Sequence, residues 1–148
     1  MVNLGSFGKA RKIGLLRQIP LFATCSQREL GEVAALTVEA EFEKGAILTR
    51  EGQSGGIAFV IAAGTADVVR GDKRLARLGE GDVVGEMSLI DGRPRSATVY
   101  ATSDLQVLEI SAADLQRLLK RAPSVLRKLL EAMSLRLREM DALVTTNT

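Results

Sequence analysis

The chain has 148 residues, 46% of them hydrophobic, and a net charge of +2, which suits one domain that buries its own core. It has no histidine and a single cysteine, Cys25, which argues against a zinc site, a Ser-His-Asp triad and an internal disulfide. Its acidic and basic residues are interspersed, and no apolar run reaches the ~20 residues of a membrane span. We therefore expect a cytoplasmic protein without a metal site, a membrane span or a direct nucleic-acid surface.

The N-terminal quarter is predicted to be helical. Residues 1–14 form a glycine-containing extension that is flexible or helical, with a short helix at 10–16 that stops before Pro20. The next helix, at 26–36, opens with the Ser-x-x-Glu pattern of a capping box and continues with apolar residues at helical spacing.

The central part of the chain alternates between short β-prone runs and glycines. Val38, Ala40 and Phe42 alternate with glutamates, a period of two that is typical of a half-buried strand. Short strands separated by close turns predict an antiparallel barrel or sandwich. The expected strands are 38–42, 46–49, 57–62, 65–70, 73–78, 98–102 and 106–110.

Two helices are predicted at the C-terminal end. The first covers 112–120, and the second covers about 124–144, with Pro123 in a position that suits its first turn. Apolar residues of the second helix follow a 4-3-4-3-4 spacing, the a/d seam of a short coiled coil. These residues are Leu126, Leu130, Met133, Leu137, Met140 and Val144.

The segment VVGEMSLIDGRPRSATV, residues 83–99, concentrates the chemistry of the chain. Gly85 permits a close backbone approach, and residues 86–90 can form one helical turn whose first amides favour an anion. Arg95 offers planar donors that suit phosphate, and Glu86 offers an acceptor for hydroxyl groups. A sugar phosphate would satisfy both, although the two side chains could instead form a salt bridge across the turn.

The stretch GEMSLIDGRPRSATV, residues 85–99, resembles the phosphate-binding cassette of the cyclic nucleotide-binding domains in Crp-like regulators, protein kinase A regulatory subunits and cyclic-nucleotide-gated channels. IPLF at 19–22, FEKGAILTREG at 42–52 and FVIAAGTADV at 59–68 resemble other family segments in the same order. The resemblance covers about 15–137. It implies a mixed α and β fold in which an antiparallel, jelly-roll-like β-roll carries a short N-terminal helical segment, a cassette helix and two C-terminal helices, with residues 15–148 as the domain.

The resemblance also assigns roles to residues of this cassette. Glu86 would accept from the ribose 2′-hydroxyl, Arg95 would pair with the equatorial phosphate oxygen, and Ser96 would contact the phosphate or a guanine. Backbone amides of the cassette would complete the phosphate and ribose contacts, and two valines would line the apolar part of the pocket. The amides are those of Gly85, Met87, Ser88 and Ala97, and the valines are Val83 and Val84.

The expected ligand is cyclic AMP, with cyclic GMP as the alternative, since Ser96 stands where threonine tends to accompany guanine in the family. Crp-like regulators read adenine with hydroxyl side chains of the long C-terminal helix. The corresponding positions here are Met140 and Asp141, so the mode of base reading departs from that pattern.

We therefore predict a sensor or regulatory domain, not an enzyme, that binds a cyclic nucleotide and moves its C-terminal helix. That helix could cover its own pocket as a lid or pair with a second copy, and the seam favours a homodimer. A downstream protein partner would receive the signal if the protein acts alone. The alternatives are a ligand-independent interaction scaffold, or the excised regulatory domain of a larger transcription factor, kinase or channel.

Overall fold

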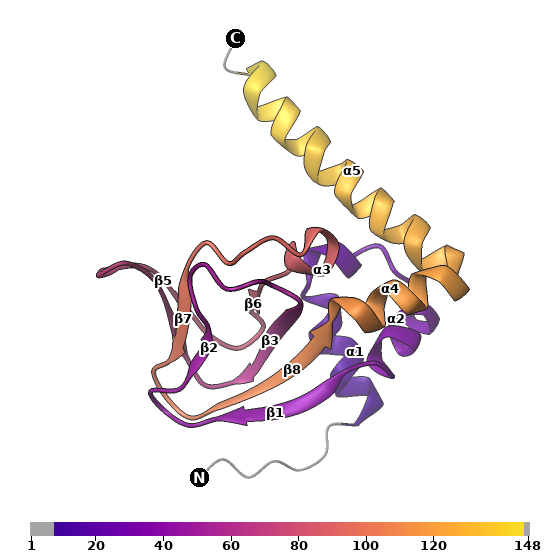
Figure 1. Ribbon diagram of the computed structural model, residues 1–148. Helices are drawn as coiled ribbons and strands as arrows, with labels where there is room; N and C mark the ends of the chain where they lie inside the picture. Colours follow the sequence, from indigo (N-terminus) through magenta and orange to yellow (C-terminus); the bar gives the residue numbers. More distant parts are fainter. Residues whose placement is uncertain (1–7, 147–148) are drawn as a thin grey trace.

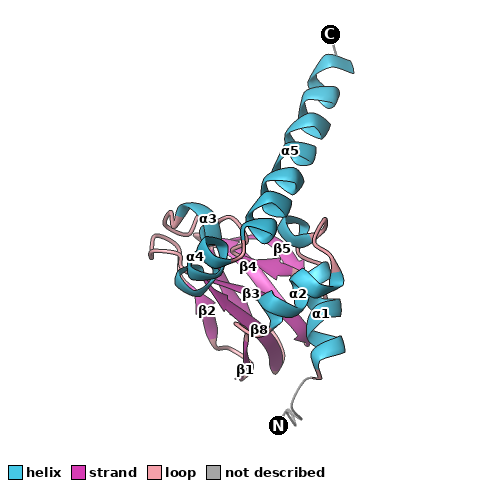
Figure 2. Cartoon of the chain, turned by 90° about the vertical axis from the view of Figure 1, so that its right-hand side faces the viewer, coloured by secondary structure: helices cyan, strands magenta, loops and turns pink. Residues whose placement is uncertain are grey.

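The computed structural model describes residues 8–146. Two four-stranded antiparallel sheets lie against each other, and the helices gather at one end of them (Figures 1 and 2). The helices are α1 (Lys9–Arg17), the 3₁₀ turn η1 (Pro20–Phe22), α2 (Gln27–Ala34), α3 (Ser88–Asp91), α4 (Ala112–Arg121) and α5 (Pro123–Thr146). The strands are β1 (Val38–Phe42), β2 (Ile47–Thr49), β3 (Ile57–Ala63), β4 (Ala66–Arg70), β5 (Lys73–Leu78), β6 (Val83–Val84), β7 (Thr98–Ala101) and β8 (Leu105–Ser111).

One sheet has the order β1-β8-β3-β6 and the other has the order β2-β7-β4-β5. The seven strands expected from sequence are confirmed to within one residue at each end. The predicted β-roll fold is therefore confirmed, as two facing sheets and not a closed barrel. β6 was not predicted, because two residues are too few to show a period; it exists through pairing of Val83 and Val84 with Val60 and Phe59 of β3.

The helix boundaries differ from the predictions mainly at α2. Ser26 caps this helix as expected, and both bonds of its capping box with Glu29 are formed. The helix ends at Ala34 and not at residue 36, because the amides of Leu36 and Thr37 turn back to carbonyls three residues earlier. α5 continues beyond the predicted residue 144, to Thr146.

The core has two parts. Phe59, Ile61 and Val107 belong to the part that lies between the sheets. The other part joins the helices to the first sheet and includes Leu16 of α1 and Val125 and Leu129 at the start of α5.

The predicted boundary at residue 15 lies inside α1, whose Ile13, Leu15 and Leu16 are buried. The rest of the predicted N-terminal extension, residues 1–7, lies outside the described residues.

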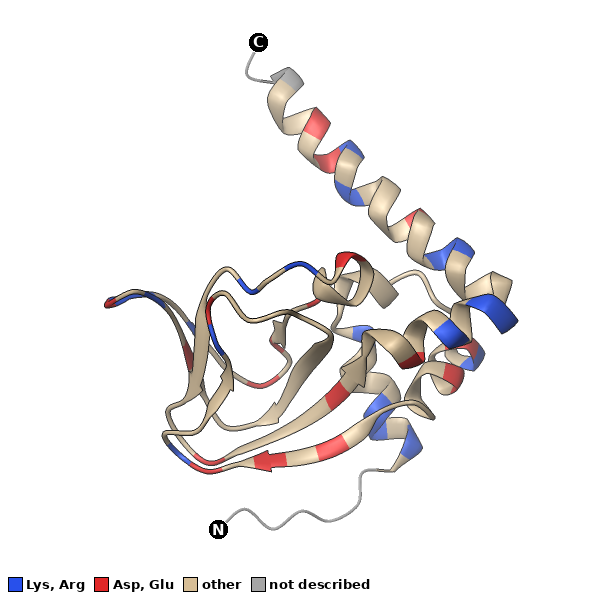
Figure 3. Cartoon of the chain, viewed as in Figure 1, with Lys and Arg blue, Asp and Glu red and all other residues tan. Residues whose placement is uncertain are grey.

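The second half of α5 leaves the body of the domain (Figure 1). It carries exposed apolar side chains. Charged residues of both signs are spread over the helices, whereas the charged residues of β1 are acidic (Figure 3). Within residues 8–146, none of the helices has the length and apolar character of a membrane-spanning segment.

Candidate ligand-binding site

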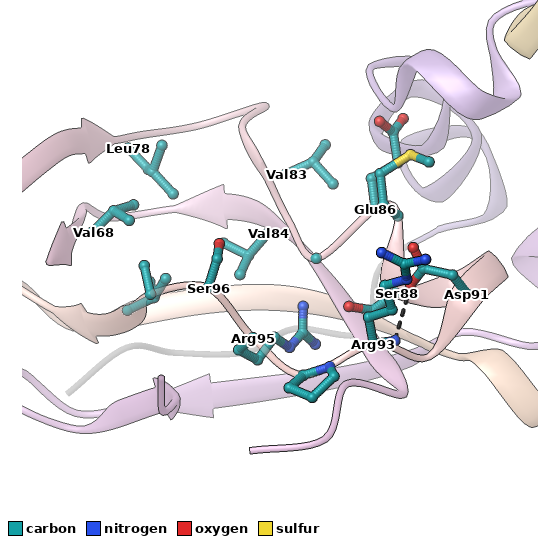
Figure 4. Close-up of a pocket in the computed structure, with 15 residues that line it drawn as sticks. Val68, Leu78, Val83, Val84, Glu86, Ser88, Asp91, Arg93, Arg95 and Ser96 are labelled. Atoms are coloured by element: carbon teal, nitrogen blue, oxygen red, sulfur yellow. Dashed lines mark hydrogen bonds between the residues drawn. The ribbon is translucent and has the colours of Figure 1, made fainter. Parts of the chain in front are cut away.

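A cavity lies where the cassette, residues 85–99, faces the strands of the second sheet (Figure 4). Every predicted contact residue of the cassette lines it, together with the two valines of β6: Val83, Val84, Gly85, Glu86, Met87, Ser88, Arg95, Ser96 and Ala97. The structure adds residues that the sequence did not single out: Val68, Leu78, Asp91, Arg93, Pro94 and Val99. One wall of the cavity is therefore apolar and the other carries charge.

The cassette turns sharply after β6. Gly85 has φ +79°, which is strained for any residue with a Cβ, and the helical turn follows at once. α3 begins at Ser88, two residues later than expected, because the first bonds of the turn run from Ser88 N to Gly85 O (3.1 Å) and from Leu89 N to Glu86 O (3.2 Å). The Ser88 amide, expected to be free for a ligand, thus already donates inside the turn.

An extended segment carries Arg95 into the cavity. Arg95 N donates to Gln53 O at 2.8 Å, and Gly52 N donates to Arg95 O at 2.8 Å, so residues 93–95 run beside 52–55. Gly55 allows this approach: a Cβ there would lie 2.6 Å from Ser88 Cβ and 3.0 Å from Arg93 O. Two short stretches that are distant in sequence thus fix the backbone of the cassette.

Arg95 has a backbone partner. Its Nη2 donates to Ile57 O, and its guanidinium lies against Gly85, where a Cβ would be 2.6 Å from Arg95 Cζ. Burial lowers the pKa of Arg95. Among the described residues no carboxylate pairs with Arg95. A partly desolvated guanidinium without a counterion is a favourable contact for an anion.

Glu86 points away from Arg95 (Figure 4). Its Oε2 accepts from the amide of Leu21 at 2.7 Å, and its Oε1 accepts from Arg136 Nη1 of α5, also at 2.7 Å. The salt bridge between Glu86 and Arg95, the alternative left open by the sequence, is therefore not formed in this structure. Neither Leu21 nor Arg136 was predicted, because nothing local in the sequence marks a partner 65 or 50 positions away.

Met140 and Asp141 do not line the cavity in this structure. They lie on the half of α5 that extends away from the sheets (Figure 1). Met140 is 63% exposed. The base-reading role expected for these two positions is thus not assembled in this conformation. Only a different position of α5 would bring them to the cavity.

The apolar wall consists of valines and a leucine from both sheets. Val83 and Val84 of β6 belong to the first sheet, and the other members belong to the second. Val68 and Leu78 come from β4 and β5, and Val99 comes from β7. Ser96 stands at their edge, where its carbonyl accepts from Arg70 Nε at 3.0 Å. The wall offers a planar ring apolar contacts, and the described residues hold no cluster of His, Cys, Asp or Glu that could bind a metal ion.

Comparison with known proteins decides the family. The family model of the cyclic nucleotide-binding domain matches residues 39–122. The chain belongs to this family. A cAMP-dependent protein kinase regulatory subunit of Colletotrichum orbiculare is 30% identical over 76% of this chain and 29% of its own length. A cyclic AMP receptor protein of Thermus thermophilus is 32% identical over 82% of this chain and 59% of its own length.

The solved structures agree with the family. The N-terminal domain of a transcriptional regulator from Streptomyces coelicolor A3(2) superposes with a TM-score of 0.82, at 32% identity, over 88% of this chain and 94% of that one. This chain therefore spans less than a third of the length of the kinase subunit and nearly all of the bacterial N-terminal domain. The family assignment identifies a ligand-binding, regulatory class of domain.

Proposed function

We propose that this cyclic nucleotide-binding domain is a sensor for cyclic AMP and reports the bound nucleotide through α5. The observation that carries the proposal is the position of Arg95 at the cavity without a paired carboxylate in the described part of the chain. Its guanidinium lies at the cavity without a carboxylate partner among the described residues, and burial lowers its pKa. An anion of the size of a cyclic phosphate would supply the missing negative charge.

In the proposed complex, Arg95 pairs with the phosphate and Glu86 accepts from the ribose 2′-hydroxyl. The Gly85, Met87 and Ala97 amides and the Ser88 hydroxyl complete the polar contacts, and Ser96 lies beside the phosphate. The base packs on the apolar wall that includes Val83 and Val84. Each role uses a donor or an acceptor that the residue possesses.

Cyclic AMP is proposed ahead of cyclic GMP for two reasons. Ser96 replaces the threonine that tends to accompany guanine in the family, and relatives include a cAMP-dependent kinase subunit and a cyclic AMP receptor protein, besides a cGMP-dependent protein kinase of Toxoplasma gondii. Recognition of the adenine amine by Asp141, with Met140 against the ring, would require α5 to fold toward the cavity.

The proposed signal is a change in the position of α5. Arg136 on α5 holds one oxygen of the carboxylate that the ribose needs. A ribose hydroxyl at Glu86 would compete with Arg136, so the nucleotide would favour a different arrangement of α5. Ligand binding and the movement of α5 would thus be coupled through the carboxylate of Glu86.

We further propose that α5 pairs with a second copy of the chain. The helix exposes a row of apolar side chains along its length that the domain itself leaves uncovered: Leu126, Leu130, Leu137, Met140 and Val144. A parallel pair would bury them, whereas a lid over the cavity would bury only part of the row. The output would then reach a partner protein or a further domain, and the domain itself would catalyse no reaction.

The test is isothermal titration calorimetry with cyclic AMP and cyclic GMP on the wild type and on Arg95→Ala. Loss of one side of a buried charged contact costs on the order of 2–5 kcal/mol, roughly 30-fold to several-thousand-fold in affinity. Arg127→Ala is the matched control, because Arg127 is an exposed arginine that does not line the cavity.

The expected result is tighter binding of cyclic AMP than of cyclic GMP, a loss on that scale for Arg95→Ala and no change for Arg127→Ala. A wild type that binds neither nucleotide would refute the sensor and leave the scaffold role. Tighter binding of cyclic GMP would reverse the choice of base.

A further inference from the structure

A second arginine lines the cavity beside Arg95. Arg93 lies two residues earlier, and its side chain reaches the part of the cavity near Ser88 and Asp91 (Figure 4). The family resemblance gives this position no role. The cavity therefore has two guanidinium groups where the cassette pattern requires one.

The backbone explains why both arginines face the cavity. Residues 93–95 are extended, with Pro94 bridged to Ser54 and hydrogen bonds to residues 52–55 on either side of it. In an extended segment, side chains two positions apart point to the same side. Arg93 and Arg95 therefore both face the cavity, and Pro94, which has no N–H, sits between them without leaving a donor unpaired.

The guanidinium of Arg93 has no charged or hydrogen-bonding partner among the described residues. Its backbone amide donates to Asp91 Oδ1 at 2.9 Å, which fixes the start of the segment. The guanidinium forms no hydrogen bond or ion pair with residues 8–146, in contrast with Arg136, which pairs with Glu86. Arg93 thus keeps five N–H donors for a ligand.

We propose that Arg93 is a second phosphate-contacting residue, so that Arg95 and Arg93 each bind one of the two exocyclic oxygens of the cyclic phosphate. The inference rests on the proposed function, since it deepens the same site. A cyclic phosphodiester spreads one negative charge over two exocyclic oxygens, and an arginine on each side satisfies both. Arg93 is exposed, so its contribution is smaller than that of Arg95.

The experiment compares three ligands: cyclic AMP and its Sp and Rp phosphorothioates, in which sulfur replaces one exocyclic oxygen or the other. Each is titrated by calorimetry into the wild type, Arg93→Gln, Arg93→Lys and the control Arg127→Gln. Arg93→Gln is expected to weaken cyclic AMP binding up to about fivefold, with partial recovery in Arg93→Lys and no change in Arg127→Gln.

The phosphorothioates separate a direct contact from a general effect of charge. Sulfur is a weaker acceptor, so the loss caused by Arg93→Gln should shrink for the diastereomer whose sulfur faces Arg93 and persist for the other. The inference would be overturned if Arg93→Gln lost the same affinity for both diastereomers, or if its affinities equalled those of Arg127→Gln. Either result would leave the proposed sensor function intact. Absence of binding to the wild type would instead refute the proposed function itself.

Discussion

Arg136 Nη1 lies 2.7 Å from Glu86 Oε1, so a residue in the middle of α5 is hydrogen-bonded to the cassette carboxylate that faces η1. The side chain of Glu86 is 12% exposed and that of Arg136 is 46% exposed. The amide of Leu21 holds the other oxygen. Three elements that are distant in sequence, η1, the cassette and α5, therefore meet at one carboxylate.

Replacement of Arg136 by glutamine should tighten cyclic AMP binding. The substitution removes the partner with which the ribose must compete, and a half-exposed charged hydrogen bond is worth on the order of 1 kcal/mol, about fivefold in affinity. Calorimetry would measure the change, with Arg138→Gln on the same helix as the control. Weaker binding by Arg136→Gln would show instead that Arg136 orients Glu86 for the ligand.

Ligand binding should change the distance between α5 and the sheets. Burial raises the pKa of Cys25 to about 11, so at neutral pH a thiol-reactive spin label should react with introduced cysteines in preference to it. Labels at Glu139→Cys and Asp72→Cys, in protein diluted with unlabelled chains, would report the intramolecular distance by pulsed electron spin resonance. An identical distance distribution with and without saturating cyclic AMP would contradict movement of the helix.

Gly85→Ala should damage the site more than the fold. A Cβ at φ +79° costs roughly 1–2 kcal/mol of backbone strain, and it would also occupy the place of the Arg95 guanidinium. Gly45→Ala is the matched control, because Gly45 has φ +93° and open space around it. Urea unfolding should show similar losses of stability for both variants, whereas calorimetry should show weaker nucleotide binding only for Gly85→Ala. Equal nucleotide affinities of Gly85→Ala and Gly45→Ala would mean that the Arg95 side chain can move away from residue 85 without weakening binding.

Asp67 should make the fold sensitive to acid. Arg77 Nε donates to Asp67 Oδ1 at 2.8 Å, and this hydrogen bond is the main reason why the pKa of the carboxyl lies below its ordinary 3.8. The ionised carboxylate therefore contributes stability that is fully present above pH 4 or so and is lost as pH falls through the lower folded pKa. Urea unfolding from pH 5 to pH 2.5 should show a flatter pH dependence for Asp67→Asn. If the free energy of unfolding fell with pH in parallel for the wild type and Asp67→Asn, Asp67 would not be a source of the acid sensitivity.

The outer half of α5 should control self-association. Leu137 and Met140 are 66% and 63% exposed, so their joint replacement by glutamate removes apolar contacts between copies without opening the core. Sedimentation equilibrium should give a dimer for the wild type and a monomer for the double variant, while Arg138→Glu, which adds negative charge outside the seam, should remain dimeric. A monomeric wild type at the highest concentrations studied would leave the lid as the role of the helix.

The sequence predicted the elements whose signals are local. The alternation in β1, the capping box of Ser26 and Glu29, and the apolar spacing along α5 each reflect a period or a contact within a few residues. The cassette was equally readable, because the turn at Gly85, the helical turn and Arg95 form one continuous stretch. The sequence by itself therefore determined the β-roll fold and the cassette part of the cavity, whereas Val68, Leu78 and Val99 of the facing wall came only from the structure.

Only the tertiary structure decided what those residues touch. β6 exists by pairing with β3, Glu86 is held by residues 65 and 50 positions away, and Arg93 faces the cavity because residues 52–55 keep its segment extended. The direction of α5 likewise separates Met140 and Asp141 from the cavity that they were expected to line. These contacts form only when segments distant in sequence pack together. A residue's partner 50 or 65 positions away leaves no pattern in the sequence around it.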